Sequence, residues 1–151
     1  MIKHILFPSD GSEASRQARQ YLKDFASATG AEVSLIHTYD FNIGHVMSRY
    51  GASLDMLQEL EKQVAASGQK LMEDVKQDLN AAGIVVKGLY TEKGDPGEWI
   101  VKIADTQGCD LILMGTRGMG ALKSALLGST SHYVVNHAHK PVCLVPVQTQ
   151  K

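Results

Sequence analysis

The sequence predicts an α/β domain built on a mostly parallel sheet that helices cover on both faces. Short apolar runs that suit buried strands alternate with longer segments in which apolar residues recur at helical spacing. The chain has 151 residues, a length at which chains seldom divide, so we expect one domain with one core over residues 1–151. No internal repeat competes with this interpretation.

The first βαβ unit follows from the N-terminal residues. Residues 2–8 are an apolar run that ends in Pro-Ser-Asp-Gly, which is typical of a buried strand and a turn. Apolar residues then recur on one helical face from Ser12, the expected N-cap, to Gly30 just beyond the helix end. Residues 33–39 are β-branched and aromatic enough for a second strand.

The next residues fall into two parts, one without a regular apolar pattern and one with a helical pattern. Residues 40–53 show no sustained period and predict a mobile loop. Residues 57–79 then predict one long amphipathic helix, which tolerates Gly68 and ends at Gly83. Its apolar stripe is best interpreted as core, and residues 56–60 beside the loop are an alternative candidate for a partner surface.

The third strand and third helix have the clearest local signals. Residues 84–91 predict the strand. Asp95 then suits an N-cap, Pro96 the first helical position and Glu98 the far end of a capping box. We expect this helix to end at Gly108.

The last two strands flank a glycine-rich connection. Residues 111–114 form a fourth apolar strand, and the connection leads from it to Gly128. The final strand is expected over Val142–Val147, where Pro146 favours an edge position. Between them, a last helix runs to His137, and three hydroxyl residues can cap it: Ser129, Thr130 and Ser131.

Composition excludes several classes of function. Fifteen Lys and Arg against sixteen Asp and Glu leave a formal charge of -1, which argues against binding of nucleic acid or an anionic membrane surface. No apolar stretch approaches the roughly 20 residues of a membrane span. The two cysteines, Cys109 and Cys143, lie far apart and suit small buried side chains in a reducing compartment, so the cytoplasm is expected.

Two loops that follow strands are the candidate binding site, because ligands of open α/β sheets lie beyond the carboxyl ends of the strands. The first loop is residues 8–12. The second has Gly115 and Gly118, then nine residues, then Gly128 and Ser129 at a helix start. Glycines let main-chain N–H groups approach phosphate oxygens, and a helix N-terminus adds unpaired donors. Arg117 and Lys123 supply positive charge and three hydroxyl groups supply further donors, from Ser129, Thr130 and Ser131.

The glycine-rich connection matches neither of two common phosphate-binding motifs. It is not a Walker A loop, because no Gly-Lys-Ser/Thr follows four spacer residues. It is not a dinucleotide fingerprint, because Lys123 stands where the third glycine would be. Its glycines could be turn residues of an ordinary surface loop, but the connection is longer than most, and long connections tend to be functional.

These motifs together resemble a known family. The glycine connection follows Asp-Leu-Ile-Leu-Met at residues 110–114 and precedes His-Ala-His-Lys-Pro-Val at residues 137–142. In this setting it is similar to the ATP-binding signature of the universal stress protein family. The opening residues 4–12 and Gly-Asp-Pro at residues 94–96 resemble the same family, so the likeness spans essentially the whole chain.

The resemblance implies a fold and an assembly. It implies a doubly wound, adenine nucleotide alpha hydrolase-like sheet of five parallel strands in the order 3-2-1-4-5, with a cleft between the first and fourth strands. It also implies a homodimer, paired through the edge strand at Val142–Val147. Neither the strand order nor the dimer can be read from periodicity.

The resemblance also implies ligand positions. Asp10 would accept a hydrogen bond from ribose or help to place Mg²⁺, and Thr38 would meet adenine through main-chain groups. The residues expected around ATP are Pro8, Ser9, Asp10, Thr38, Met114, Gly115, Arg117, Gly118, Gly128, Ser129, Thr130 and Ser131.

Several polar side chains also suit purely structural roles. Asp10 suits an Asx turn into the first helix, a role compatible with ligand binding. The cysteines lack an adjacent cation and are poor candidates for nucleophiles. Four histidines suggest a metal site: His37, His132, His137 and His139. His137 and His139, however, lie two residues apart at a helix end with no evident carboxylate partner, so interaction with the helix C-terminus explains them better than metal binding.

Three functions remain open. The first is a cytoplasmic regulatory module of the stress response that senses adenine nucleotide. No strong general base is evident beside the loop, where Asp10 and Glu13 are the nearest candidates, so at most slow ATP hydrolysis or autophosphorylation is expected. The second is an adenylating enzyme of the ATP-pyrophosphatase type, although residues 9–15 lack the paired glycines of that loop. The third is a dimeric interaction protein without nucleotide.

Overall fold

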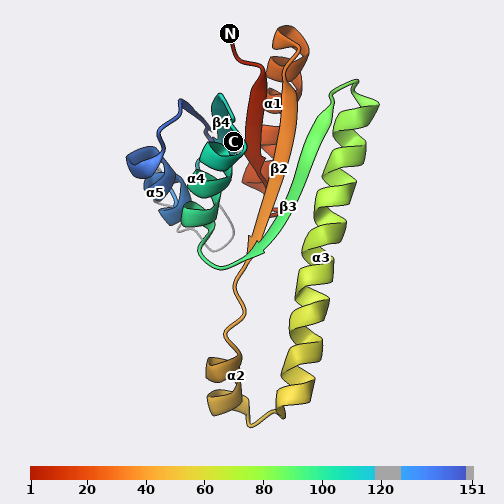
Figure 1. The fold of residues 1–151 in the computed structure, drawn as a ribbon, viewed down its shortest axis with the longest axis vertical. Helices are drawn as coiled ribbons and strands as arrows, with labels where there is room; N and C mark the ends of the chain where they lie inside the picture. Colours follow the sequence, from red (N-terminus) through yellow and green to blue (C-terminus); the bar gives the residue numbers. More distant parts are fainter. Residues whose placement is uncertain (118–126, 149–151) are drawn as a thin grey trace.

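The computed structural model describes residues 1–117 and 127–148, and in this part of the chain five strands alternate with helices (Figure 1). All the strand pairs are parallel, and the sheet order is β3-β2-β1-β4-β5, as expected. The elements are β1 His4–Pro8, α1 Glu13–Thr29, β2 Glu32–Tyr39, α2 Ile43–Tyr50, α3 Leu54–Ala81, β3 Val86–Lys93, α4 Pro96–Thr106, β4 Leu111–Gly115, α5 Ser129–His137 and β5 Val142–Val145.

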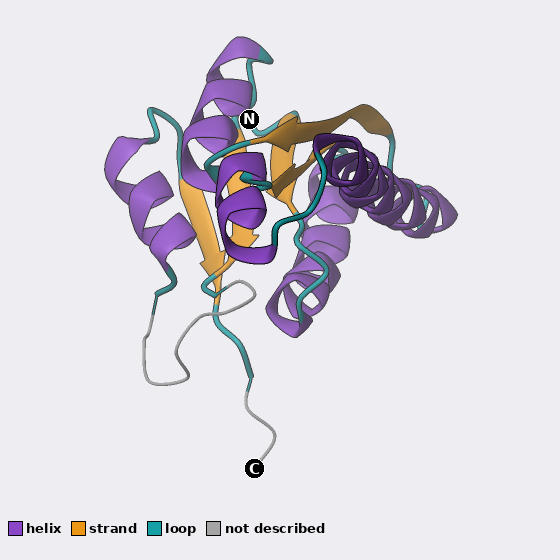
Figure 2. Cartoon of the chain, turned by 90° about the horizontal axis from the view of Figure 1, so that it is seen from below, coloured by secondary structure: helices purple, strands orange, loops and turns teal. Residues whose placement is uncertain are grey.

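Helices cover both faces of the sheet (Figure 2). Alternate side chains of β1 point to opposite faces, so Ile5 and Phe7 enter one core cluster and Leu6 enters the other. The first cluster takes in buried residues of α1 and α3, and the second takes in buried residues of α4 and α5. The sheet is therefore doubly wound, as the alternation of strands and helices predicts.

The position of the ligand crevice follows from this order. From β1 the chain winds through β2 to β3 and then crosses back to β4 and β5 on the other side of β1. The winding direction reverses between β1 and β4, and open α/β sheets bind ligands at such a point, beyond the carboxyl ends of the strands.

The prediction of a loop over residues 40–53 was wrong, because the segment contains α2. Asn42 caps this helix through its side-chain oxygen, which accepts from the N–H of His45 at 3.0 Å. Gly51 ends it in the left-handed conformation, with φ 61°. A helix of eight residues makes only about two turns, too few to show a sustained period in the sequence.

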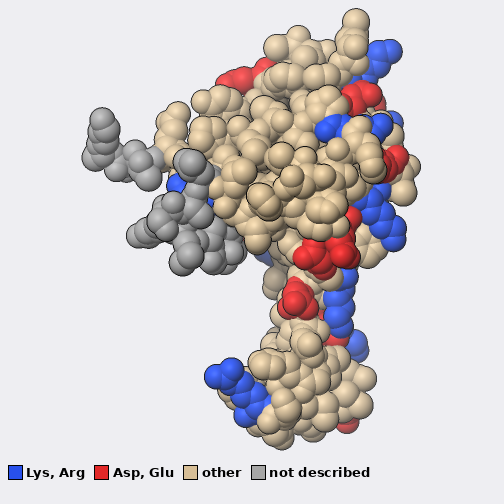
Figure 3. Space-filling view, turned by 90° about the vertical axis from the view of Figure 1, so that its left-hand side faces the viewer, with Lys and Arg blue, Asp and Glu red and all other residues tan. Residues whose placement is uncertain are grey.

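Helix α2 and the N-terminal part of α3 project from the sheet body as a helical hairpin (Figures 1 and 3). No residue of α2 is buried. The predicted stripe of α3 is core at Leu57, Val75 and Leu79, which are buried, whereas Leu60 is exposed, as is Met56 beside it. The exposed large apolar side chains of this hairpin are Met47, Tyr50, Leu54, Met56 and Leu60. A partner surface at residues 56–60 stays a prediction.

Several strand boundaries differ by one or two residues from those expected. β3 begins at Val86 rather than at Ile84, whose N–H instead donates to the carbonyl of Leu79 at the end of α3, at 3.0 Å. β4 extends one residue further, to Gly115. β5 ends at Val145 rather than at Val147, because the following Pro146 has no N–H to donate to a ladder.

A buried polar cluster lies at the amino end of β1, at the edge of the sheet opposite to the expected ligand crevice. His4 Nε2 lies 2.8 Å from the hydroxyl of Ser34 and 3.8 Å from Sγ of Cys109. Burial, assisted by the positive charge of Lys87, lowers the pKa of His4 below its ordinary value, and burial raises the pKa of the Cys109 thiol to about 11. The imidazole is therefore held in a place that favours its neutral form, and Cys109 behaves as the inert buried side chain that was expected.

This cluster predicts a loss of stability in mild acid. Because the folded-state pKa of His4 lies below the unfolded value of about 6.5, the unfolded chain takes up a proton first as the pH falls. The free energy of unfolding should therefore decline as the pH drops below about 6.5. Urea unfolding at pH 7.5 and pH 5 measures this decline, and it should be smaller in His4→Gln, which cannot titrate. An equal decline in both proteins would contradict the assignment.

Candidate functional site

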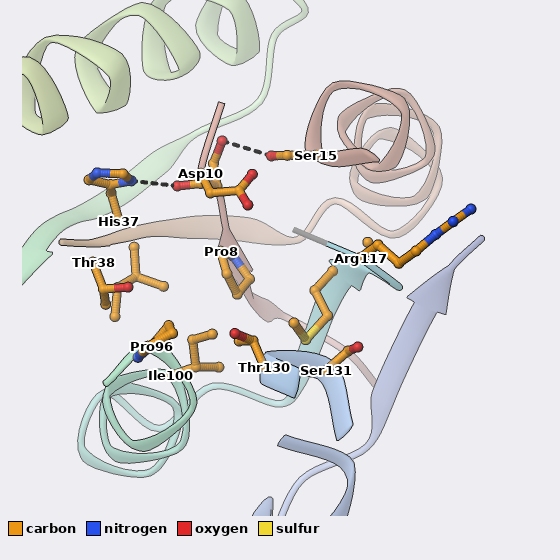
Figure 4. Close-up of a pocket in the computed structure, with 14 residues that line it drawn as sticks. Pro8, Asp10, Ser15, His37, Thr38, Pro96, Ile100, Arg117, Thr130 and Ser131 are labelled. Carbon is orange, nitrogen blue, oxygen red and sulfur yellow. Dashed lines mark hydrogen bonds between the residues drawn. The ribbon is translucent and has the colours of Figure 1, made fainter. Parts of the chain in front are cut away.

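A cavity of about 310 Å³ lies at the carboxyl ends of β1, β2 and β4, where the crevice is expected (Figure 4). Most of the expected ATP-site residues line it: Pro8, Ser9, Asp10, Thr38, Met114, Gly115, Arg117, Thr130 and Ser131. Gly128 and Ser129 stand beside it at the start of α5 without lining it, and Gly118 and Lys123 lie outside the described residues. Sequence reasoning missed five lining residues: Ser15, Ile36, His37, Pro96 and Ile100.

The loop between β1 and α1 is fixed by local hydrogen bonds. The N–H of Ser9 donates to the carbonyl of Ile36 at 2.9 Å, and the Ser9 hydroxyl lies 2.8 Å from that of Ser15. Asp10 Oδ1 accepts from the N–H of Ser12 at 2.9 Å, which is the expected Asx turn. Both lining residues of this loop, Ser9 and Asp10, are thus held in place before any ligand arrives.

The connection from β4 to α5 closes on the carbonyl of Thr116. This oxygen accepts from the N–H of Gly128 at 2.7 Å and from the hydroxyl of Ser131 at 2.7 Å. The three hydroxyl residues expected to cap α5 do not do so, because Gly128 holds the extended cap conformation and Ser129 is already helical. Glycine has no side chain to accept from the first-turn N–H groups, and such groups have no acceptor within their own helix.

Gly115 has a packing role that the sequence did not reveal. A Cβ added there would lie 3.1 Å from the carbonyl oxygen of Ala14, in the first turn of α1. The glycine was predicted to let the main chain approach phosphate. It does line the cavity, but what requires a glycine in the described structure is the close approach of β4 to α1.

The cavity has one apolar and one polar end. Thr38 of β2 faces Pro96 and Ile100 of α4 at the apolar end, and Ile36 of β2 also lines the cavity. Asp95 caps α4 by accepting from the N–H of Glu98 at 2.9 Å, as predicted, and this places the first turn of α4 against the cavity. Thr130, Ser131 and Arg117 line the polar end. The side chain of Arg117 extends away from the apolar end (Figure 4).

The histidines other than His37 do not line the cavity. His139 Nδ1 lies 3.1 Å from Oδ2 of Asp105, so the expectation that it lacks a carboxylate partner was wrong: residues 34 positions apart meet through the packing of the chain. His137 donates to the carbonyl of Tyr133 at 2.8 Å, an interaction with the last turn of α5 as predicted. Among residues 1–117 and 127–148, no three His, Cys, Asp or Glu side chains gather in a way that could hold a metal ion.

Thiol state and helix hydropathy also bear on the possible classes of function. Cys109 is buried and Cys143 is partly buried, and both are free thiols. A search of the described helices finds none with the length and apolar character needed to cross a bilayer.

Comparisons with known proteins place this chain in a family. The model of the universal stress protein family matches residues 1–146. Universal stress protein MJ0577 of Methanocaldococcus jannaschii is 34% identical over an alignment of 155 residues. The alignment covers 96% of this chain and 95% of the relative. The solved structure of hypothetical protein MJ0577 has a TM-score of 0.83 at 33% identity and 99% coverage of both chains. The chain belongs to the universal stress protein family.

Two more distant structures share the fold and were solved with nucleotides. One is a universal stress protein in complex with cAMP, with a TM-score of 0.65 at 20% identity, over 96% of this chain and 97% of that one. The other is a family member from Arabidopsis thaliana with AMP bound, with a TM-score of 0.65 at 16% identity, over 97% of this chain and 93% of that one.

The close approach at Gly115 gives a prediction about stability. Gly115→Ala should lower the free energy of unfolding by about 1–3 kcal/mol, because the added methyl group meets a main-chain carbonyl that cannot move without α1. Urea unfolding measures the loss. Gly44→Ala in α2 is the matched control, because its methyl group would meet an ordinary contact distance of 3.5 Å. A Gly115→Ala protein as stable as the control would show that the approach is not tight in solution.

Proposed function

We propose that this chain binds ATP in the cavity between β1 and β4 and serves as a nucleotide-responsive regulatory module. The observation that carries the proposal is the polarity of the cavity. Its apolar end suits a purine base, and its polar end offers hydroxyl groups, first-turn N–H groups of α5 and the Arg117 side chain. A ligand with a flat apolar head and an anionic tail matches both ends, and ATP is such a ligand.

The comparisons support an adenine nucleotide in particular. The cAMP and AMP complexes show that two proteins with this fold hold adenine nucleotides. We expect the base between β2 and α4, ribose near Asp10, and phosphates toward Thr130 and Ser131. Gly118, which lies outside the described residues, completes the proposed phosphate loop. Asp10 is the carboxylate that would help to hold Mg²⁺, since Mg²⁺ in nucleotide sites takes one or two carboxylates with the phosphates.

Regulation is favoured over catalysis by the side chains that face the cavity. The titratable groups among its described lining residues are Asp10, His37 and Arg117. His37 Nδ1 donates to the carbonyl oxygen of Ser9, and Asp10 Oδ1 accepts from a main-chain N–H, so both groups are engaged in holding the loop between β1 and α1. We propose at most slow hydrolysis or autophosphorylation, with nucleotide occupancy acting on a protein partner that the sequence does not identify.

The proposal includes an assembly and a compartment. β5 is an edge of the sheet, and pairing of this edge about a two-fold axis would give the homodimer that the family resemblance implies, through residues 142–147. Two free thiols suit the reducing cytoplasm, where ATP is abundant.

The polar end of the cavity can be tested by charge removal. Arg117→Ala should weaken binding of ATP about tenfold or more, the loss expected for a charge-assisted hydrogen bond, and should change AMP binding far less. Calorimetric titration of both nucleotides, with Mg²⁺ present, measures the difference. Arg49→Ala is the control, because Arg49 is exposed in the last turn of α2 and does not line the cavity.

Three results would contradict the proposal. Failure of the wild-type chain to bind ATP at millimolar concentration would favour an interaction protein without nucleotide. Equal loss of ATP and AMP binding in Arg117→Ala would remove that side chain from the phosphates. Rapid release of pyrophosphate with a carboxylate acceptor would favour the adenylating enzyme.

A further inference from the structure

We infer that His37 is a positioning residue for the nucleotide cavity. We also infer that residue 68 of α3 is glycine because a side chain there would displace the His37 ring. The inference rests on the proposed function, because it concerns how this same site is kept ready for its ligand. It assigns a role to a histidine whose sequence context suggested only a weak metal ligand, and to a glycine that the helix pattern merely tolerates.

The His37 ring ties β2 to the loop after β1. Its Nδ1 lies 2.9 Å from the main-chain carbonyl oxygen of Ser9 (Figure 4). A carbonyl oxygen only accepts, so Nδ1 carries the proton and donates. The N–H of the same Ser9 donates to Ile36, the residue before His37, so one peptide segment is held on both sides by β2. The position of Asp10, which follows directly, depends on this clamp.

Helix α3 holds the opposite edge of the ring. A Cβ added at Gly68 would come within 2.5 Å of Cδ2 and 3.1 Å of Nε2 of His37. It would also lie 3.2 Å from Cγ2 of Thr91 on β3. Gly68 is buried although glycine is among the least favourable residues for a helix interior. The ring thus lies between Ser9 and the main chain of α3, with no room for a side chain at residue 68.

These contacts make His37 act through Ser9 and Asp10 rather than as a ligand-binding group. Displacing the ring would release the Ser9 carbonyl and shift the loop that lines one wall of the cavity. Two substitutions separate this role from a direct contact with the nucleotide. Asparagine carries an amide N–H donor near the place of Nδ1, with its amide oxygen near the place of Cδ2, and leucine has the same branched shape with no donor at all.

The test is a double-mutant cycle read by calorimetric titration with ATP and Mg²⁺. His37→Leu should weaken binding about tenfold, and His37→Asn less than about threefold, because only the asparagine keeps the hydrogen bond. Gly68→Ala should weaken binding about tenfold in the His37 protein and less than about threefold further in the His37→Ala background, where no ring remains to be displaced. His45→Asn, on the exposed surface of α2, is the control.

Two further readouts separate positioning from general destabilisation. Thermal unfolding of Gly68→Ala should show a smaller loss of melting temperature than Gly115→Ala, because alanine favours helix and the atoms that it meets belong to side chains, even as ATP affinity falls. Nitrogen NMR of the ligand-free protein should find the proton of His37 on Nδ1. Equal losses in His37→Asn and His37→Leu, no loss in either, or the same effect of Gly68→Ala in both backgrounds would each overturn the inference while leaving ATP binding intact. Absence of ATP binding by the wild-type chain would remove the proposed function as well.

Discussion

The pairing of β1 with a parallel strand on each side sets the geometry of the whole molecule. Its three central residues, Ile5, Leu6 and Phe7, have no exposed surface, and their alternation divides the core into two clusters. Parallel neighbours bring the carboxyl ends of β1, β2 and β4 to one edge of the sheet. Loops that are far apart in the sequence meet there for that reason alone, and the cavity is a consequence of strand order rather than of any one motif.

Much of this arrangement could be predicted because its causes are local or periodic. Apolar runs, helical spacing and the Asp95-Pro96 cap are sequence signals with a direct physical reason, and the corresponding elements are present. The strand order was available only through the family resemblance. The capped helix α2 was missed because its signal is two end residues, Asn42 and Gly51, and not a period.

What could not be predicted is contact between segments distant in the sequence. Gly68, Gly97 and Gly115 each leave room for another element: the ring of His37, the ring of Tyr133 and the carbonyl of Ala14. None has a positive φ, so no turn pattern marks these glycines in the sequence. The same limit explains why Pro96 and Ile100 were not expected in the cavity, although Pro96 belongs to a motif that carries the family resemblance.

The near-neutral chain charge is compatible with binding a polyanion when the anion is small. A nucleic acid presents a long array of phosphates, and binding it demands a basic surface. A single nucleotide presents its phosphates at one place, where a helix N-terminus and one or two cations can meet them. In the proposed site the start of α5 and Arg117 would meet the phosphates, and the apolar end of the cavity would add burial of the base. A formal charge of -1 therefore argues against binding of nucleic acid without arguing against binding of a nucleotide.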